Sequence, residues 1–156
     1  MIQMITPLSA TQEQALESFT SGLNCAQSVI TSYAERFGFD EALAADIACA
    51  FGGGMGRLQK TCGAVTGAFM ALSIYNAGVS ADAKERKEKT YQMVQAFNRR
   101  FTEMHGTTQC RSLLGCDLNT EMGREYAKTH NLTESVCRKC VLHAVQIVDE
   151  LIGSAE

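Results

Sequence analysis

The sequence predicts an all-α protein, a single-domain bundle of about five to seven helices joined by short loops. Apolar residues recur at helical spacing along most of the chain. The chain has one proline, so long segments are free to be helical. No segment alternates apolar and polar residues in the way that predicts a strand. A length of 156 residues suits one compact domain, and no repeat or linker divides it, so we expect residues 1–156 to form a single domain.

Three helices are expected before the glycine-rich loop at residues 51–56, and each begins at a residue type that caps helices. The three caps are Ser9 or Thr11, Asn24 and Asp40. Gly22 and Gly38 are expected to end the first two helices, because glycine readily adopts the left-handed conformation that follows a helix. The loop itself breaks the helical pattern.

Helical spacing resumes at Thr61 or Cys62 and stops at Gly78. Ser80 is expected to cap the longest helix, whose charges of mixed sign at residues 84–89 are typical of a solvated face. The remaining elements are a short segment at 110–115, a helix at 121–130 and a final helix from Thr133 or Glu134.

The charge of the chain weighs against nucleic acid as a partner. The formal net charge is −3 and no basic run is present, whereas phosphate binding needs a basic surface. Residues Met1–Thr6 carry no positive charge and no long apolar run, unlike an export signal. No stretch has the length needed to cross a bilayer. We therefore expect a soluble cytoplasmic protein that binds no nucleic acid and does not span a membrane.

Cysteine is the one strong anomaly of the composition, with seven residues. They are Cys25, Cys49, Cys62, Cys110, Cys116, Cys137 and Cys140. Without an export signal, a disulfide framework is a poor explanation. A single cysteine is most often a small buried apolar residue, but seven together favour a working site made by three or more of them.

The start of the helix at residue 62 holds the strongest candidate for a reactive thiol. Unpaired backbone N–H groups and the helix dipole lower the pKa of a thiol at such a position. Arg57 and Lys60 add positive charge nearby. We therefore expect Cys62 to be a thiolate nucleophile. Cys25, Cys110 and Cys137 also lie at or near expected helix starts, and a bundle can bring such ends together at one rim.

The other cysteines have weaker claims. Cys137 and Cys140 form a C-x-x-C pattern, which occurs in dithiol redox pairs and in half of a metal site. Cys140, however, lies on an apolar stripe that is typical of core packing. Cys49 lies in an apolar stretch and is expected in the core, and the spacing of Cys116 from Cys110 suits a metal site only loosely.

Four glycines are candidates for contact with a cofactor: Gly53, Gly54, Gly63 and Gly67. The last two are four residues apart, so they give a helix a smooth surface that a flat cofactor or another backbone can approach. Tight helix packing is the ordinary explanation of that spacing. The loop 51–56 lacks the patterns of phosphate-binding loops, and we expect it to let backbone pass close to the cysteine site.

Several common sites are not supported by the sequence. A second C-x-x-C and an H-x₃₋₅-H pattern are both absent, so zinc spacing is not met. His105, His130 and His143 are scattered, and none is assigned a ligand role. Hydrolase motifs are also absent.

The segment Cys62-Gly63-Ala64-Val65-Thr66-Gly67 has the C-G-A-x-x-G pattern. Further matching segments are residues 22–27, the loop 51–56, residues 110–115 with Asp117, and Cys137 before the last helix. On these motifs the chain resembles, over almost its whole length, the C-GCAxxG-C-C family, small bacterial and archaeal proteins to which redox activity is attributed. The resemblance implies that Cys25, Cys62, Cys110 and Cys137 are the four characteristic cysteines of the family.

Three functions stay open. The first is thiol–disulfide or electron-transfer chemistry with a redox partner protein or a small-molecule donor or acceptor. Within it, the family's relation to split-Soret cytochromes implies an iron–sulfur cluster as one alternative, although no C-x-x-C-H for covalent haem is present. The second is a soft metal such as zinc held by the same four cysteines. The third is a helical interaction module with structural cysteines. A homodimer is the default expectation.

Overall fold

The computed structural model describes residues 6–156, and these residues form helices with no β-strand beyond an isolated bridge between Thr61 and Gln109. The expected all-α class is confirmed. The expectation about an export signal at Met1–Thr6 falls almost wholly on residues 1–5, outside the described part. Within residues 6–156, no helix combines the length and the apolar character that a bilayer crossing requires.

Short helical segments alternate with longer helices along the chain. In chain order, the helical segments are α1 (Ala10–Thr20), α2 (Cys25–Thr31), α3 (Ala34–Phe37), α4 (Glu41–Ala48), the 3₁₀ segment η1 (Cys49–Phe51), α5 (Gly52–Met55), α6 (Gly63–Val79), α7 (Ala83–His105), α8 (Cys110–Leu114), α9 (Glu121–Thr129), the π-helical segment η2 (Thr133–Cys137) and α10 (Arg138–Ala155). Residues 6–156 thus hold more helical segments than the five to seven expected.

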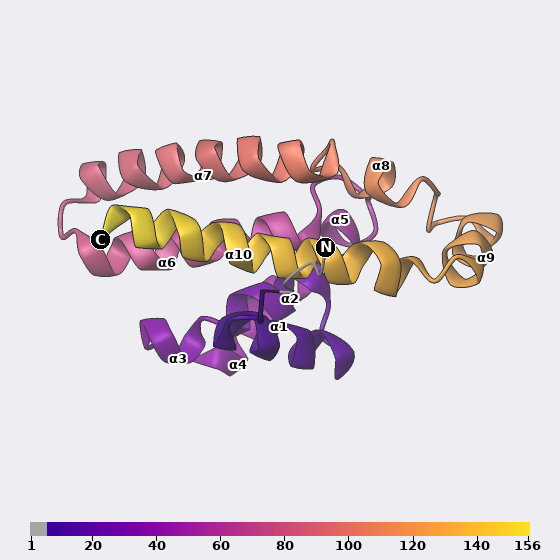
Figure 1. Ribbon diagram of the computed structural model, residues 1–156, viewed down its shortest axis with the longest axis horizontal. Helices are drawn as coiled ribbons and strands as arrows, with labels where there is room; N and C mark the ends of the chain where they lie inside the picture. Colours follow the sequence, from indigo (N-terminus) through magenta and orange to yellow (C-terminus); the bar gives the residue numbers. More distant parts are fainter. Residues whose placement is uncertain (1–5) are drawn as a thin grey trace.

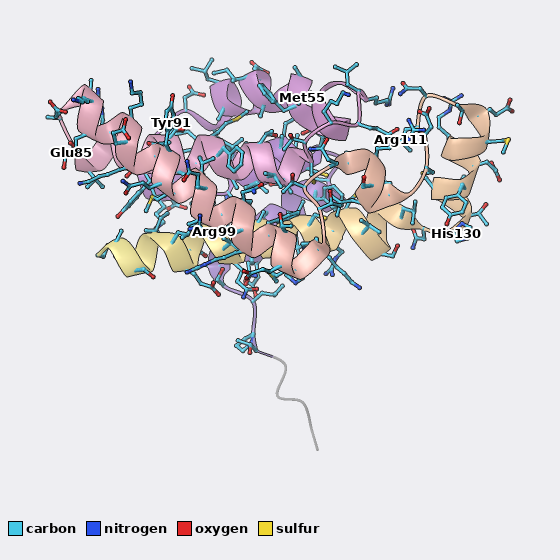
Figure 2. The ribbon with its side chains drawn as sticks, turned by 90° about the horizontal axis from the view of Figure 1, so that it is seen from above. Met55, Glu85, Tyr91, Arg99, Arg111 and His130 are labelled. Atoms are coloured by element: carbon cyan, nitrogen blue, oxygen red, sulfur yellow. The ribbon has the colours of Figure 1, made fainter. Side chains whose placement is uncertain are left out.

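The long helices α6, α7 and α10 lie side by side, and α7 runs antiparallel to the other two (Figure 1). Helices α1 to α4 cover one side of this layer, and α8 and α9 lie beyond one end of it. Figure 2 shows this end from above, where Arg111 of α8 and His130 after α9 lie far from Glu85 near the start of α7. The starts of α6, α8 and η2–α10 therefore lie at the same end of the bundle.

Turn-forming residues explain why the expected helix at 24–38 is divided. The hydroxyl of Ser32 donates a hydrogen bond to the carbonyl of Val29 at 2.6 Å, which competes with the regular helical bonding of that carbonyl. The chain leaves α2 at Thr31 and begins α3 at Ala34. Gly38 then ends α3 with a positive φ of 70°, as expected.

The helix caps agree with the sequence expectation at three starts and differ at a fourth. Ser9 and Asn24 each form a reciprocal capping box, and the Asp40 carboxylate accepts a hydrogen bond from the N–H of Leu43. The longest helix is capped by Asp82, not by Ser80. The hydroxyl of Ser80 instead donates to the Glu85 carboxylate at 2.7 Å. The Asp82 carboxylate accepts the capping hydrogen bond from the N–H of Glu85.

The core depends on a close approach between α6 and α2. Gly67 of α6 packs directly on Ala26 of α2: a Cβ added to Gly67 would lie 2.7 Å from the carbonyl oxygen of Ala26 and 3.1 Å from its Cα. Around this contact, fully buried side chains from α2, α6, α7 and α10 form a hydrophobic core cluster. The largest are Tyr33, Phe97, Phe101, Ile30, Leu72, Ile147 and Ile152.

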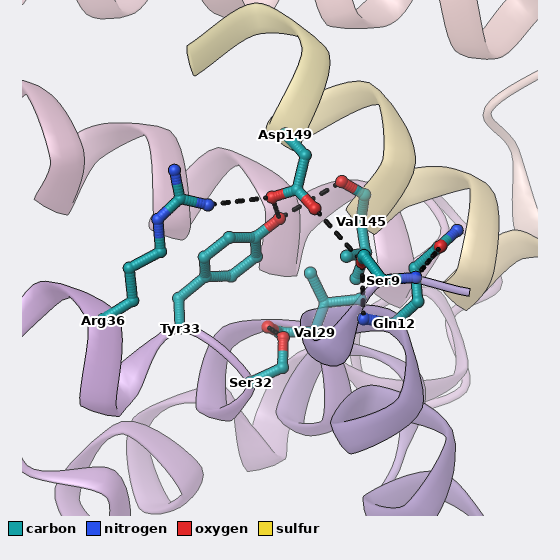
Figure 3. A network of polar contacts seen from close by, with 8 residues as sticks. All are labelled: Ser9, Gln12, Val29, Ser32, Tyr33, Arg36, Val145 and Asp149. Carbon is teal, nitrogen blue, oxygen red and sulfur yellow. Dashed lines mark hydrogen bonds and ion pairs between the residues drawn. The ribbon is translucent and has the colours of Figure 1, made fainter. Parts of the chain in front are cut away.

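Tyr33 links α10 to the N-terminal helices through a partly buried polar network (Figure 3). Its hydroxyl donates to Asp149 at 2.9 Å and lies 3.2 Å from the carbonyl oxygen of Val145. Asp149 also pairs with Arg36 at 3.2 Å and accepts a hydrogen bond from Ser9. Burial, followed by the nearby Asp149 carboxylate, raises the pKa of Tyr33, so the hydroxyl stays a donor.

We expect Gly67→Ala to lower the free energy of unfolding by about 1–3 kcal/mol, because the new methyl group meets backbone of α2 that can move only with its helix. Gly78→Ala is the matched control in the same helix. A Cβ at residue 78 meets no heavy atom of the described chain within 4 Å, so its stability should be unchanged or slightly higher. Urea unfolding measures both, and equal effects would contradict the proposed contact.

We expect Tyr33→Phe to cost about 1–2 kcal/mol of unfolding free energy, because it removes the donor to Asp149 while the ring remains. Tyr75→Phe serves as the control, since the hydroxyl of Tyr75 makes no hydrogen bond to other groups of residues 6–156. Thermal or urea unfolding provides the readout. A Tyr33→Phe protein as stable as the Tyr75→Phe protein would show that the network contributes nothing.

Candidate functional site

Two loops that pair with each other place Cys62 and Cys110. The N–H of Cys62 donates to the carbonyl of Thr108 at 2.8 Å, and the N–H of Cys110 donates to the carbonyl of Lys60 at 2.7 Å. Between them lies the antiparallel bridge of Thr61 and Gln109. These bonds fix the start of α6 beside the start of α8, although the two cysteines are far apart in sequence.

The glycine loop makes room for this arrangement. Gly54 has a positive φ of 65°, and a Cβ added to it would lie 2.7 Å from the Cβ of Cys110 and 2.7 Å from the Cα of Gln59. Only a residue without a side chain fits there. The loop thus passes close to the cysteines, as the sequence led us to expect.

Gln59 holds the segment between α8 and α9 in place. Its side chain is 3% exposed, accepts a hydrogen bond from the N–H of Leu118 at 2.8 Å and donates to the carbonyl of Cys116 at 3.0 Å. Its own carbonyl accepts from the N–H of Arg111 at 3.1 Å. No sequence signal predicts this role, because glutamine in a loop is usually exposed to solvent.

Cys25 is the first residue of α2, directly after the cap Asn24. Gly63 of α6 allows this helix start to approach: a Cβ on Gly63 would lie 3.1 Å from the backbone nitrogen of Ala26 and 3.2 Å from the Cβ of Cys25. The absence of a side chain at Gly63 therefore brings Cys25 next to Cys62.

The last helix supplies two cysteines. Cys137 ends the π-helical segment η2, in which the N–H of Arg138 bonds to the carbonyl of Thr133, and the helical backbone continues into α10. Cys137 therefore lies a turn inside a continuous helix, not at a free helix start as expected. Cys140 follows one turn later in α10 and is 1% exposed.

These five cysteines line one cavity of about 90 Å³. Gly53, Gly54 and Gly63 also line it, whereas Gly67 lies in the packing contact between α6 and α2. The remaining wall is apolar and consists of Leu113, Leu114, Leu118 and Val136. The four cysteines singled out by the sequence are thus together, and Cys140, which we had expected only in the core, is among them.

The thiol of Cys62 is the more acidic partner of a pair with Cys140. A side-chain hydrogen bond from Cys140 lowers the pKa of Cys62, and the backbone N–H groups of Ala64 and Val65 lower it further against the opposing effect of burial. The same hydrogen bond and burial raise the pKa of Cys140. Arg57 and Lys60, which we had expected to lower the pKa of Cys62, do not contribute to this shift, and both residues are exposed.

Cys25 and Cys137 form a second pair of the same kind. A hydrogen bond with Cys137, together with burial, raises the pKa of Cys25 well above that of a free thiol. The hydrogen bond from Cys25 lowers the pKa of Cys137. Cys110 is in neither pair, and burial raises its pKa to about 12.

Two cysteines do not line the cavity. Cys49 is exposed, so the expectation of a core position was wrong: Cys49 begins the 3₁₀ segment after α4, which turns its side chain away from the core. Cys116 is half-buried, and its carbonyl bonds to Gln59. All seven cysteines are free thiols.

The present arrangement of the thiols does not fit a metal ion or a cluster. Within residues 6–156, no group of three or more histidine, cysteine, aspartate or glutamate side chains is placed to hold a metal ion. Four of the five cavity cysteines are hydrogen-bonded in two pairs, and Cys110 is in neither pair. Four sulfur ligands around one centre would need a different geometry.

One histidine pair was missed by the sequence reasoning. Nε2 of His105 in α7 and Nδ1 of His143 in α10 lie 2.9 Å apart, and the ring of His105 stacks on Phe101. Burial lowers the pKa of both histidines. The pair joins two helices beyond the cavity, and no sequence spacing relates residues so far apart.

Comparison with known proteins identifies one family for this chain. A family model described as "Putative redox-active protein (C_GCAxxG_C_C)" matches residues 23–151. The chain belongs to this family. Searches of curated proteins and of solved structures gave no match. The matched range of this C_GCAxxG_C_C protein contains every cysteine of the cavity, and redox activity is the description that the family carries.

We expect Cys62 to be alkylated at lower pH than Cys110. A lowered pKa means that the reactive thiolate is present at lower pH, whereas a pKa of about 12 keeps Cys110 protonated through the neutral range. Iodoacetamide labelling at a series of pH values, followed by peptide mass spectrometry, measures both sites in one sample. Labelling of Cys110 first, or of both at the same pH, would contradict the assigned electrostatics.

Proposed function

We propose that this C_GCAxxG_C_C protein is a thiol–disulfide redox protein whose reacting groups are Cys25, Cys62, Cys110 and Cys137. The observation that carries the proposal is their convergence on one small cavity, from four separate elements. Cys62 is the first nucleophile, because its thiolate is favoured by hydrogen bonds from a thiol and from backbone N–H groups.

The second pair supports two-electron chemistry. The thiols of Cys25 and Cys137 are hydrogen-bonded to each other and line the same cavity, so they are the natural partners for a disulfide. When the pair is oxidised, two electrons and two protons leave, and an acceptor disulfide that takes them up becomes two thiols. Cys137, whose thiolate is favoured, is the attacking member of this pair.

The other functions considered receive less support. A helical module with structural cysteines requires no convergence of the sulfur atoms, whereas these line one cavity. Iron–sulfur or zinc binding requires a ligand arrangement that residues 6–156 do not have. We therefore propose a redox partner protein or a small disulfide as the exchange partner, and the cytoplasm, where thiols are kept reduced, as the location. A homodimer stays a prediction.

The test is oxidation by bis(2-hydroxyethyl) disulfide, a probe small enough for a narrow cavity. In the reduced wild type we expect thiols to be lost in pairs at neutral pH, and reductant to restore them. Cys62→Ser should slow this paired loss by about tenfold, since the remaining thiols lack its acidity, and Cys62→Ser combined with Cys137→Ser should stop the loss of thiols in pairs. Thiol titration of the denatured protein provides the count.

Cys49→Ser is the matched control, because Cys49 is an exposed cysteine outside the cavity, and it should behave as the wild type. Iron, sulfide and zinc analysis of anaerobically purified protein accompanies the titration. A thiol loss that is equally fast in the wild type and the double variant would overturn the proposal, as would a stoichiometric metal.

A further inference from the structure

Cys140 belongs to the cavity although it is outside the four-cysteine pattern of the family. Its side chain is 1% exposed, and its thiol is hydrogen-bonded to Cys62. It also lines the cavity beside the apolar wall. A cysteine that served only to fill the core would not need a sulfur partner at this position.

The C-x-x-C segment is not a dithiol pair within itself. Cys137 at the end of η2 and Cys140 in the first turn of α10 lie one helical turn apart, but each thiol bonds to a cysteine on a different element. Cys137 contacts Cys25 at the start of α2, and Cys140 contacts Cys62 at the start of α6. The last helix therefore supplies one thiol to each of two pairs that cross between helices.

We propose that Cys140 is the resolving cysteine of Cys62, so that the product of oxidation at this pair is a Cys62–Cys140 disulfide. The inference rests on the proposed function and adds a catalytic residue to it. The other cavity cysteines are less suited to resolve a mixed disulfide on Cys62. Cys25 and Cys137 are hydrogen-bonded to each other, and Cys110 is hydrogen-bonded to neither pair.

The exchange with a disulfide RSSR proceeds in two balanced steps. The Cys62 thiolate attacks one sulfur, the S–S bond of RSSR breaks, and RS⁻ leaves while a Cys62–SR mixed disulfide forms. RS⁻ takes the proton of Cys140, and the resulting Cys140 thiolate attacks the Cys62 sulfur. A second RS⁻ leaves and takes a proton from solvent, replacing the one that Cys62 lost on ionising. Two electrons pass from the protein to RSSR, which becomes two RSH.

The interaction between Cys62 and Cys140 determines that Cys62 reacts first. Before reaction, the Cys140 proton is held by its hydrogen bond to Cys62, and the negative charge of Cys62 disfavours a second thiolate. Formation of the mixed disulfide removes that charge and that acceptor together. The pKa of Cys140 then falls, so Cys140 becomes nucleophilic only after Cys62 has reacted.

The experiment maps disulfides after reaction of the full-length protein with bis(2-hydroxyethyl) disulfide. In the wild type we expect a Cys62–Cys140 linked peptide and no retained probe. In Cys140→Ser, which keeps a hydroxyl donor for Cys62, we expect loss of that link and accumulation of the probe on Cys62. Cys49→Ser should give the wild-type link. Acid quenching and peptide mass spectrometry identify the species.

A link from Cys62 to Cys25, Cys110 or Cys137, with Cys140 reduced, would overturn this inference and leave the proposed function standing. No disulfide of any kind at Cys62 would overturn both. Circular dichroism verifies that Cys140→Ser is folded, and Cys140→Ala is the second variant. If neither folds, the wild-type peptide map alone decides the outcome, because it identifies the partner of Cys62 directly.

Discussion

The contact between α6 and α2 is the constraint on which the rest of the molecule depends. A Cβ on Gly67 would lie 2.7 Å from the carbonyl oxygen of Ala26, and one on Gly63 would lie 3.1 Å from the backbone nitrogen of Ala26, so the two helices meet at backbone distance. One glycine packs the core, and the other sets the start of α6 beside Cys25. The same feature that closes the bundle therefore assembles the first part of the cysteine cavity, which ties stability to the chemistry of the site.

A second constraint is the pairing of two irregular segments at the same end of the bundle. Backbone bonds between residues 60–62 and 108–110, with Gln59 buried beneath them, fix Cys62 relative to Cys110. Helices then deliver Cys25, Cys137 and Cys140 to the same place. Cys62, Cys110 and Cys140 are buried and Cys25 and Cys137 are half-buried in a small, largely apolar cavity, so the charge on one sulfur strongly affects its neighbour.

The fold class and most helix starts could be predicted from the sequence because caps and apolar spacing are local signals. Ser9, Asn24 and Asp40 cap helices through groups three residues away, and such contacts need no knowledge of the rest of the chain. Prediction failed where a distant or competing contact decided. The Ser32 hydroxyl bonds to Val29 and divides the expected helix in two. Asp82, and not Ser80, caps the longest helix. Cys49 is exposed at the end of α4.

The sequence by itself determined that Cys25, Cys62 and Cys110 stand at helix starts, and its motifs indicated the family. It did not determine which thiol faces which, because the partners are separated by many residues and no local spacing encodes the distance between them. Only the tertiary structure paired Cys25 with Cys137 and Cys62 with Cys140. The physical reason is that η2 and α10 form one continuous helix that packs on α2 and α6, so Cys137 and Cys140, one turn apart, reach two different helices.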